Sequence, residues 1–271
     1  MDMLLGKQTG YSQTYNPEIL YPVARSEKRQ DIPYNDDKIE GCDVWVCYEV
    51  SCLDMRGKPM TFIGLLSYTS HSNYIIESKS LKLYLNSFNM TEFNDATELE
   101  NLVIRDLSNV LGCAVVFYLF TTKEFNKMNP IRESKGCNFD LWELKDDVEL
   151  KYEVDSDILV KDENEEEIHF NSELLRSNCL VTGQPDWGTI EIYIKGEVPT
   201  AESLLRYIIS FRNHQEFHEQ IVERIISTLL DKFEIEECFV KCNYVRRGGI
   251  DINPIRCYNM QLPIWARTYR Q

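Results

Sequence analysis

Alternating apolar and polar residues predict two neighbouring strands early in the chain. Residues 43–52 alternate over ten positions, and residues 60–68 form a second strand with a more continuous apolar run. The turn formers of residues 56–59 separate them, so the pattern predicts a hairpin. Residues 7–40 are polar and rich in turn formers, which indicates an arm lying on the surface.

Two amphipathic helices and a strand are expected next. Leu81, Leu85 and Phe88 share one face of a helix within residues 75–88, and Ser78 or Ser80 would cap its start. Apolar residues recur at spacings of three and four between Asp95 and Gly112, which predicts a second helix. The apolar run at residues 113–120 then predicts a buried strand.

The second half of the chain repeats this order. We expect a strand at 187–196, helices at about 201–211 and 214–233, and strands at 237–246 and 261–267. The nine residues from Ser80 match the nine from Ser203 at five positions. Two helices between strands, occurring twice, predict a duplicated α+β module. The acidic residues between the two copies, 121–176, including Asp146-Asp147 and the run 162–167, indicate a solvated connector.

Composition narrows the classes of function. The 271 residues include 29 Lys and Arg against 44 Asp and Glu, and the net charge of -15 argues against broad nucleic-acid binding. A local basic pocket can still bind a small anion. The nine cysteines are odd in number and contain no C-x-x-C, which indicates reduced thiols. With no apolar stretch of membrane-spanning length and no signal peptide, we expect a soluble protein in the cytoplasm.

One loop combines a thiol with a carboxylate. In the segment Ser177–Trp187, Cys179 and Asp186 flank Gly183 and Pro185, which interrupt regular structure before the next strand. A thiol and a carboxylate on one loop suit a nucleophile and a proton donor. A buried thiol followed by a turn is the alternative, and the spacing alone does not separate the two.

Two histidines near a helix start form only an incomplete metal-binding pattern. His214 and His218 stand four residues apart, but Gln215 occupies the position where a zinc protease has Glu. His218-Glu219 suits another task, because an ionised carboxylate accepts two hydrogen bonds from a heterocycle. Glu77 offers the same group in the first half.

Two segments are candidate anion sites. Arg246-Arg247-Gly248-Gly249 combines guanidinium groups with glycines that let a phosphate approach the backbone. Ser78, Lys79 and Lys82 at a helix start form the second candidate. Solvated surface charge is the alternative for both.

Four segments together resemble the signatures of the 7-cyano-7-deazaguanine reductases. They are Glu77–Tyr84, Ser177–Trp187, Phe211–Glu219 and Arg246–Pro254, in the order found in the longer, two-module form of that family. The resemblance runs from about Tyr11 to Arg256. It implies an NADPH-dependent nitrile reductase of the queuosine pathway of tRNA modification, acting on a small molecule without binding nucleic acid directly.

The resemblance also implies a fold and an assembly. We expect an α+β protein with tandem tunnelling-fold modules, each an antiparallel sheet backed by two helices, in a homodimer with the site between the modules. The predicted divisions are an N-terminal module at 1–125, an acidic connector at 126–176 and a C-terminal module with the catalytic cysteine at 177–271.

The family pattern assigns roles to matching residues. Cys179 would attack the nitrile carbon to form a covalent thioimide, and Asp186 would donate a proton to the nitrile nitrogen. The product would be 7-aminomethyl-7-deazaguanine after reduction by two NADPH, with no metal and with a part for His218 in proton transfer. Substrate would be held by Ile76, Glu77, Ser78, His218 and Glu219. NADPH would be held by Ser78, Lys79, Arg247 and Gly248.

Two other functions fit the same fold. A zinc-dependent cyclohydrolase acting on GTP would need a Cys/His ligand set, and the chain has four histidines: His71, His169, His214 and His218. A catalytically inactive purine- or pterin-binding protein would not depend on Cys179.

Overall fold

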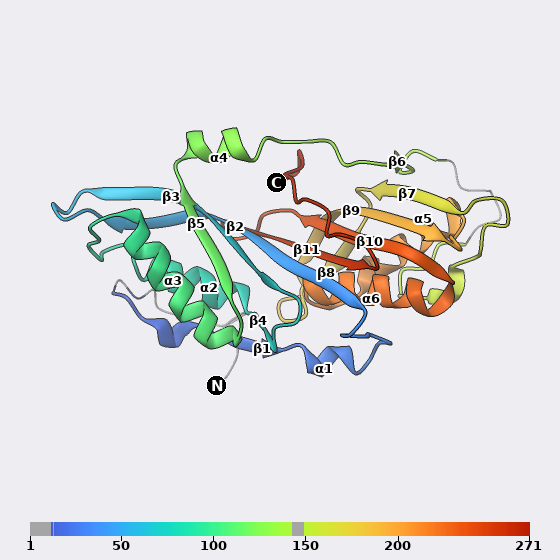
Figure 1. Ribbon diagram of the computed structural model, residues 1–271, viewed down its shortest axis with the longest axis horizontal. Coiled ribbons are helices and arrows are strands. Elements are labelled where there is room, and N and C mark those ends of the chain that lie inside the picture. The colour runs from blue at the N-terminus through green and yellow to red at the C-terminus, as the bar shows by residue number, and fades with distance from the viewer. Residues whose placement is uncertain (1–11, 13, 143–148) are drawn as a thin grey trace. The chain divides into compact units, whose positions relative to one another are not determined.

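The computed structural model describes residues 12, 14–142 and 149–271, and they form two compact units (Figure 1). The first unit contains the described residues through Glu27 together with 42–131 and 246–252, and the second contains 28–41, 132–245 and 253–271. Two of the unit boundaries fall within strands β2 (Ile39–Leu53) and β11 (Ile250–Tyr258). Part of the predicted arm, residues 7–11 and 13, and the acidic pair Asp146-Asp147 lie outside the described residues.

The first unit packs two helices on an antiparallel sheet. Its strands pair in the order β5-β3-β2, where β3 is Pro59–Thr69 and β5 is Val115–Phe120. The predicted hairpin of β2 and β3 is therefore confirmed. Helices α2 (Ser78–Asn86) and α3 (Ala96–Leu111) bury their apolar faces with these strands. The smaller elements are η1 (Pro17–Ile19), β1 (Pro22–Ala24), α1 (Ser26–Arg29), which crosses the unit boundary, β4 (Tyr74–Ile76), paired with β1, and α4 (Thr122–Met128).

Helix α3 shows how the sequence sets its own ends. The Asp95 side chain accepts a hydrogen bond from the Glu98 amide at 2.9 Å, which caps the first turn. Gly112 ends the helix with φ of 68°, a conformation that costs glycine little. Leu99, Val103 and Leu107 are fully buried between these ends, so the predicted helix is confirmed.

Two predictions in the first unit are corrected. Glu77, and not Ser78 or Ser80, caps α2, because its carboxylate accepts hydrogen bonds from the amides of the first turn. Strand β5 was predicted to be buried on both faces, but Val116 and Tyr118 are about half exposed. The reason is that β5 lies at the end of the strand order and α3 covers one of its faces.

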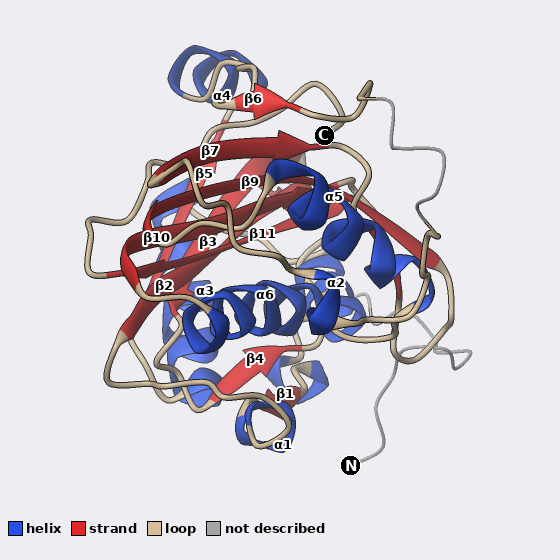
Figure 2. Cartoon of the chain, turned by 90° about the vertical axis from the view of Figure 1, so that its right-hand side faces the viewer, coloured by secondary structure: helices blue, strands red, loops and turns tan. Residues whose placement is uncertain are grey.

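The second unit also has two helices on one face of a sheet (Figure 2). Its strands pair in the order β11-β10-β9-β7-β6, with β8 added on β9; all these pairs are antiparallel except β6 with β7. Helices α5 (Ala201–Ser210) and α6 (His218–Lys232) bury leucine and isoleucine side chains against Ile190, Ile192 and Ile194. The remaining bounds are β6 (Cys137–Asn138), η2 (Ser156–Ile158), β7 (Glu167–Ser172), β8 (Arg176–Asn178), β9 (Pro185–Gly196), η3 (Phe211–Asn213) and β10 (Ile235–Tyr244).

An ion cluster holds the segment 28–41 on α6. Both oxygens of the Glu223 carboxylate accept hydrogen bonds from Arg29, at 2.7 and 3.0 Å, and Arg256 adds a contact of 2.8 Å. Glu223 and Arg256 are fully buried, and their mutual charge compensation is what makes this burial tolerable. The cluster thereby fixes the helix that carries His218 and Glu219.

Three details of the second unit differ from the prediction. Helix α6 begins at His218 instead of His214, and residues 261–267 form no strand. The last strand is instead β11, which ends before that segment. It contains Pro254 and was missed because proline cannot donate a hydrogen bond to a neighbouring strand and therefore argues against a strand. Strands β6, β7 and the first residue of β8 lie within 126–176. An α+β architecture is confirmed by both units.

Candidate active site

A tight hairpin carries the cysteine and the aspartate. Strands β8 and β9 pair Ser177 with Asp186, and the Cys179 amide donates to the Gln184 carbonyl at 2.8 Å. Gly183 closes the loop by donating to the Cys179 carbonyl at 3.0 Å, with φ of 66°. Cys179 is 4% exposed and Asp186 is 7% exposed. The predicted loop is therefore a hairpin, in which Cys179 directly follows the first strand and Asp186 lies on the second.

Asp186 and His218 form a pair. The Nε2 atom of His218 lies 3.2 Å from Oδ2 of Asp186. The Tyr244 ring covers one face of the imidazole: the two rings stack with 3.8 Å between their centroids and 11° between their planes. Tyr244 is fully buried, and burial raises its pKa well above 10, so the phenol stays neutral. The stack holds the imidazole in one orientation toward Asp186.

The segment before α6 is tied to the cysteine hairpin. The Asn178 amide donates to the His214 carbonyl at 2.8 Å. The Glu216 carboxylate binds Arg224 through two hydrogen bonds of 2.8 and 2.9 Å and lies 2.9 Å from His214. Although burial opposes ionisation, these partners lower the pKa of Glu216 to about 2. This network sets the position at which His218 and Glu219 begin the helix.

Glu219 occupies the first turn of α6 and is 2% exposed. A carboxylate in a first turn interacts favourably with the helix dipole. Such a group can accept hydrogen bonds from a heterocycle, as the sequence predicted. His214 and His218 do not share a helix face: His214 faces Glu216 and His218 faces Asp186. No group of three or more His, Cys, Asp or Glu suited to a metal occurs among the described residues.

In the first unit, the start of α2 collects another set of the predicted residues. The Glu77 oxygens accept hydrogen bonds from the Lys79 amide at 2.9 Å and the Ser80 amide at 2.8 Å. Burial raises the pKa of Glu77, while these bonds and the charge of Arg247 act in the opposite direction. Ile76 precedes it at 1% exposure, and Ser78 is partly exposed. Each Glu77 oxygen keeps a second lone pair for a ligand.

The glycine pair forms a tight turn near α2. Arg247 and Ile250 exchange backbone hydrogen bonds of 2.8 and 3.2 Å, and Gly248 and Gly249 both have positive φ. This conformation suits glycine at both central positions. Lys82 donates to the Gly248 carbonyl at 2.6 Å and to Glu49 at 3.0 Å. The predicted anion site at Lys82 is thus partly neutralised by a carboxylate, while Gly248 itself is exposed.

Sequence reasoning missed Tyr244 and Arg224, and it gave Glu216 no role although this residue stands within the segment Phe211–Glu219. Tyr244 is on strand β10 and Arg224 on helix α6, so their contacts with the site depend on the tertiary structure. Conversely, the Arg246 guanidinium, part of the glycine motif, lies 3.6 Å from the centroid of the Tyr48 ring. This cation–π contact gives Arg246 a structural role in the first unit.

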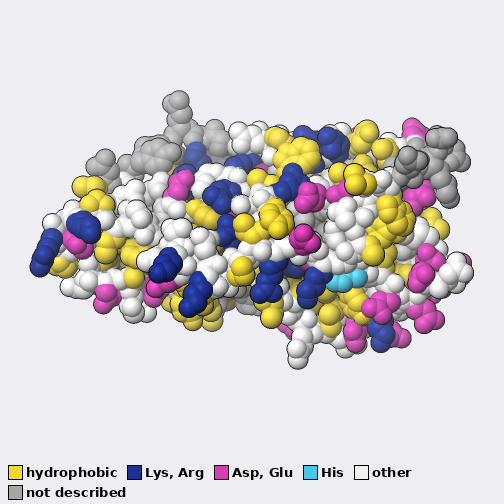
Figure 3. Space-filling view, turned by 90° about the horizontal axis from the view of Figure 1, so that it is seen from above, with side chains coloured by type: hydrophobic (Ala, Val, Ile, Leu, Met, Phe, Trp, Pro, Cys, Tyr) yellow, Lys and Arg dark blue, Asp and Glu magenta, His cyan; other side chains and the backbone are white. Residues whose placement is uncertain are grey.

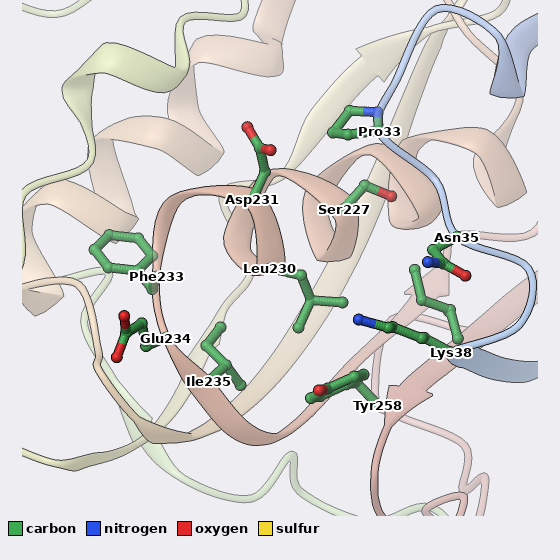
Figure 4. A pocket seen from close by; sticks show the side chains of 11 residues that line it. Pro33, Asn35, Lys38, Ser227, Leu230, Asp231, Phe233, Glu234, Ile235 and Tyr258 are labelled. Carbon is green, nitrogen blue, oxygen red and sulfur yellow. The ribbon is translucent and has the colours of Figure 1, made fainter.

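A separate cavity of about 390 Å³ lies in the second unit (Figure 4). The side chains of Lys38, Leu230, Ile235 and Tyr258 point toward its middle. Leu230 is twelve residues after His218 on α6, which corresponds to about 18 Å along the helix. None of the predicted site residues lines it. The cavity is therefore remote from the cysteine hairpin.

No helix in the described part of the chain has the length and apolar character needed to cross a membrane. The face seen in Figure 3 intersperses Lys and Arg with Asp and Glu. A mixed surface of this kind is what a net acidic globular protein shows outside a specific binding site.

Comparison with known proteins identifies the family. Residues 11–119 match the family model described as nitrile reductase, 7-cyano-7-deazaguanine-reductase N-term, and residues 185–262 match the model of QueF-like proteins. The NADPH-dependent 7-cyano-7-deazaguanine reductase of Desulfotalea psychrophila is 43% identical over 98% of this chain and 96% of its own. The reductases of Legionella pneumophila strain Lens (43%, covering 93% and 88%) and Cupriavidus pinatubonensis (42%, covering 98% and 97%) are similarly close. The chain belongs to the family of the NADPH-dependent 7-cyano-7-deazaguanine reductases.

Proposed function

We propose that this protein reduces the nitrile of 7-cyano-7-deazaguanine to the primary amine of 7-aminomethyl-7-deazaguanine, in the biosynthesis of queuosine in tRNA. The observation that carries the proposal is the short hairpin whose two sides contain Cys179 and Asp186, with Asp186 paired to His218 at 3.2 Å. The family membership supports the same substrate. The substrate is the free base, so direct contact with nucleic acid is not required, and the reaction takes place in the cytoplasm.

Cys179 acts as the nucleophile. Its thiolate sulfur forms a bond to the nitrile carbon while one π bond of the nitrile breaks. The proton released by the thiol is held by the Asp186–His218 pair, and Asp186 delivers it to the nitrile nitrogen. The result is a neutral thioimide, covalently bound through Cys179. Because the hairpin excludes most water from Cys179, the thioimide is protected from hydrolysis.

NADPH, when bound, would supply two hydrides in turn, one for the thioimide carbon and one for the carbon of the imine that remains after Cys179 departs. Cys179 would leave as a thiolate when the reduced adduct collapses. The Asp186–His218 pair would pass on two protons taken up from solvent, one to restore the Cys179 thiol and one to the nitrogen that becomes the amine. The overall change consumes two NADPH and two protons for each nitrile. Ser78, Lys79, Arg247 and Gly248 would hold the cofactor. The turn at Gly248, with its exposed backbone, fits a phosphate that approaches closely.

The heterocycle is held by carboxylates. Glu219 and Glu77 accept hydrogen bonds from its N–H groups, and both are nearly fully buried, which strengthens these bonds. Ile76 supplies an apolar surface, and Ser78 and His218 complete the set. Different carboxylates thus bind the ring and transfer the proton: Glu77 and Glu219 do the first, and Asp186 does the second.

The fold and assembly form part of the proposal. A strand pair with two helices on a sheet face occurs in both units, which supports tandem tunnelling-fold modules. The proposed modules are 1–125 and 177–271, but their bounds differ from those of the compact units: 28–41 and 132–176 belong to the second unit and 246–252 to the first. The acidic segment 126–176 is therefore more than a connector, since it supplies β6 and β7 to the sheet of the second unit. We also propose that the protein works as a homodimer, as its family pattern implies.

The test is the mass of the intact protein after mixing with 7-cyano-7-deazaguanine in the absence of NADPH. We expect a gain equal to one nitrile per chain, and no gain for Cys179→Ala. Cys242→Ala is a matched control, because Cys242 is fully buried and burial raises its pKa, so the adduct should persist. An unmodified wild-type protein with reduced Cys179 would contradict the proposal and direct attention to a metal analysis.

A further inference from the structure

Three arginines of the second unit surround one tryptophan. The guanidinium carbons of Arg176, Arg212 and Arg270 lie 5.8, 5.6 and 5.7 Å from the centroid of the Trp187 ring. They come from strand β8, the η3 turn and the segment after β11. The indole is partly exposed and Arg212 is exposed, so a ligand can reach the group. We call these four residues the arginine–tryptophan cluster.

The cluster concentrates positive charge that no carboxylate balances. Within the described ranges, none of its three arginines forms an ion pair. Arg176 donates to the Arg212 carbonyl, and Arg270 donates to the Glu173 carbonyl at 2.9 Å. Other arginines of the chain behave differently, since ion pairs with Asp or Glu are formed by Arg25, Arg29, Arg224 and Arg256. Like charges held together in a chain of net charge -15 indicate a site for an anion.

The cluster is built on the same hairpin as Cys179. Arg176 pairs in register with Trp187, directly before the pair of Ser177 with Asp186. Because neighbouring strand residues point to opposite faces, Trp187 lies on the face away from the Asp186 side chain. Arg176 is three residues before Cys179, so their Cα atoms are at most about 10 Å apart. The anion site and the reacting thiol therefore belong to the same short hairpin, with the backbones of Arg176 and Cys179 close together.

Neighbouring contacts hold Arg270 in place. The Gln271 side chain donates to the Tyr244 carbonyl at 3.3 Å and accepts from Asn243 at 3.0 Å. It also accepts from the Thr268 amide at 3.1 Å. Because the Gln271 side chain is bonded to Asn243, Tyr244 and Thr268, the backbone of the preceding residue, Arg270, is held in place. The cluster is thus organised before any ligand binds.

We infer that the arginine–tryptophan cluster binds the diphosphate of the dinucleotide cofactor. The inference rests on the proposed function. Guanidinium forks match phosphate oxygens in pairs. In NADPH the diphosphate is separated from the reactive nicotinamide by one ribose, which suits an anion site this close to Cys179.

The experiment measures the dissociation constant of NADP⁺ by calorimetry for Arg212→Gln and Arg270→Gln. Each change removes one guanidinium charge and keeps a polar, shorter side chain, and we expect the dissociation constant to rise roughly 10- to 100-fold. Arg56→Gln, at the exposed tip of the β2–β3 hairpin, should leave it unchanged. Since the cluster does not touch the nitrile, the mass gain at Cys179 without NADPH should remain in both variants.

A second measurement identifies which phosphate is bound. The ratio of kcat/KM for NADPH to that for NADH should stay within about threefold of wild type, because both cofactors contain the diphosphate. A collapse of this ratio would assign the cluster to the 2′-phosphate and overturn the inference. An unchanged dissociation constant for NADP⁺ would also overturn it. Loss of the Cys179 adduct in the wild-type protein would instead contradict the proposed function, while the calorimetry would still decide the cluster.

Discussion

Replacement of Glu216 by Gln should remove most of the stability that its charge contributes. Glu216 is 3% exposed, and its carboxylate joins Arg224 and His214 directly before α6. Glutamine has nearly the same shape and can still accept a hydrogen bond from Arg224. The change therefore isolates the effect of the negative charge.

The magnitude follows from the pKa. Burial by itself raises the pKa of Glu216, but the hydrogen bonds and charges of Arg224 and His214 outweigh it and lower this pKa from 4.5 to about 2. At about 1.4 kcal/mol for each pKa unit, the charged form contributes about 3.5 kcal/mol to the free energy of unfolding at neutral pH. Because the folded pKa is the lower one, this contribution is complete above pH 4.5 and is lost as the pH falls toward 2.

The assay is urea unfolding of the wild type and Glu216→Gln at several pH values. We expect the free energy of unfolding of the variant to be lower by about 3.5 kcal/mol at pH 7, and this difference to narrow steadily below pH 4.5. Glu165→Gln, in the exposed acidic run, is the control and should change stability by less than about 0.5 kcal/mol. A gap that stays constant between pH 7 and 3 would refute the role assigned to the charge.

Three further predictions concern the site. Glu219→Gln should weaken nitrile binding by roughly 1–3 kcal/mol through loss of a charged hydrogen bond, measured as adduct formation against nitrile concentration; unchanged affinity would remove Glu219 from the site. Arg247→Ala should raise KM for NADPH more than KM for the nitrile, and the opposite ranking in steady-state kinetics would mean that the two pockets are exchanged. Tyr244→Leu should lower kcat and shift its pH profile, because the His218 ring loses its stacking partner, whereas Tyr244→Phe should restore both. Equal behaviour of the Leu and Phe variants would exclude stacking as the reason.

Local patterns predicted the elements whose ends and faces lie in continuous sequence. Helix α3 has its cap at Asp95, its stop at Gly112 and its apolar face between them, and the structure has it within one residue of the prediction. The β2–β3 hairpin could be predicted equally well, because the alternation of apolar and polar residues and the turn residues are adjacent in the sequence. Strand β11 was not, since Pro254 argues locally against a strand that tertiary pairing with β10 nevertheless permits.

The sequence by itself determined the family and the candidate residues, because Cys179, Asp186, His218 and Glu219 stand in short motifs whose order is specific. Only the tertiary structure decided how they are supported. Tyr244 reaches His218 from another element, and Arg270 joins Arg176 across nearly a hundred residues of chain. Such contacts depend on strand register and helix packing, which are set by burial over the whole unit. These contacts therefore cannot be predicted from local sequence patterns.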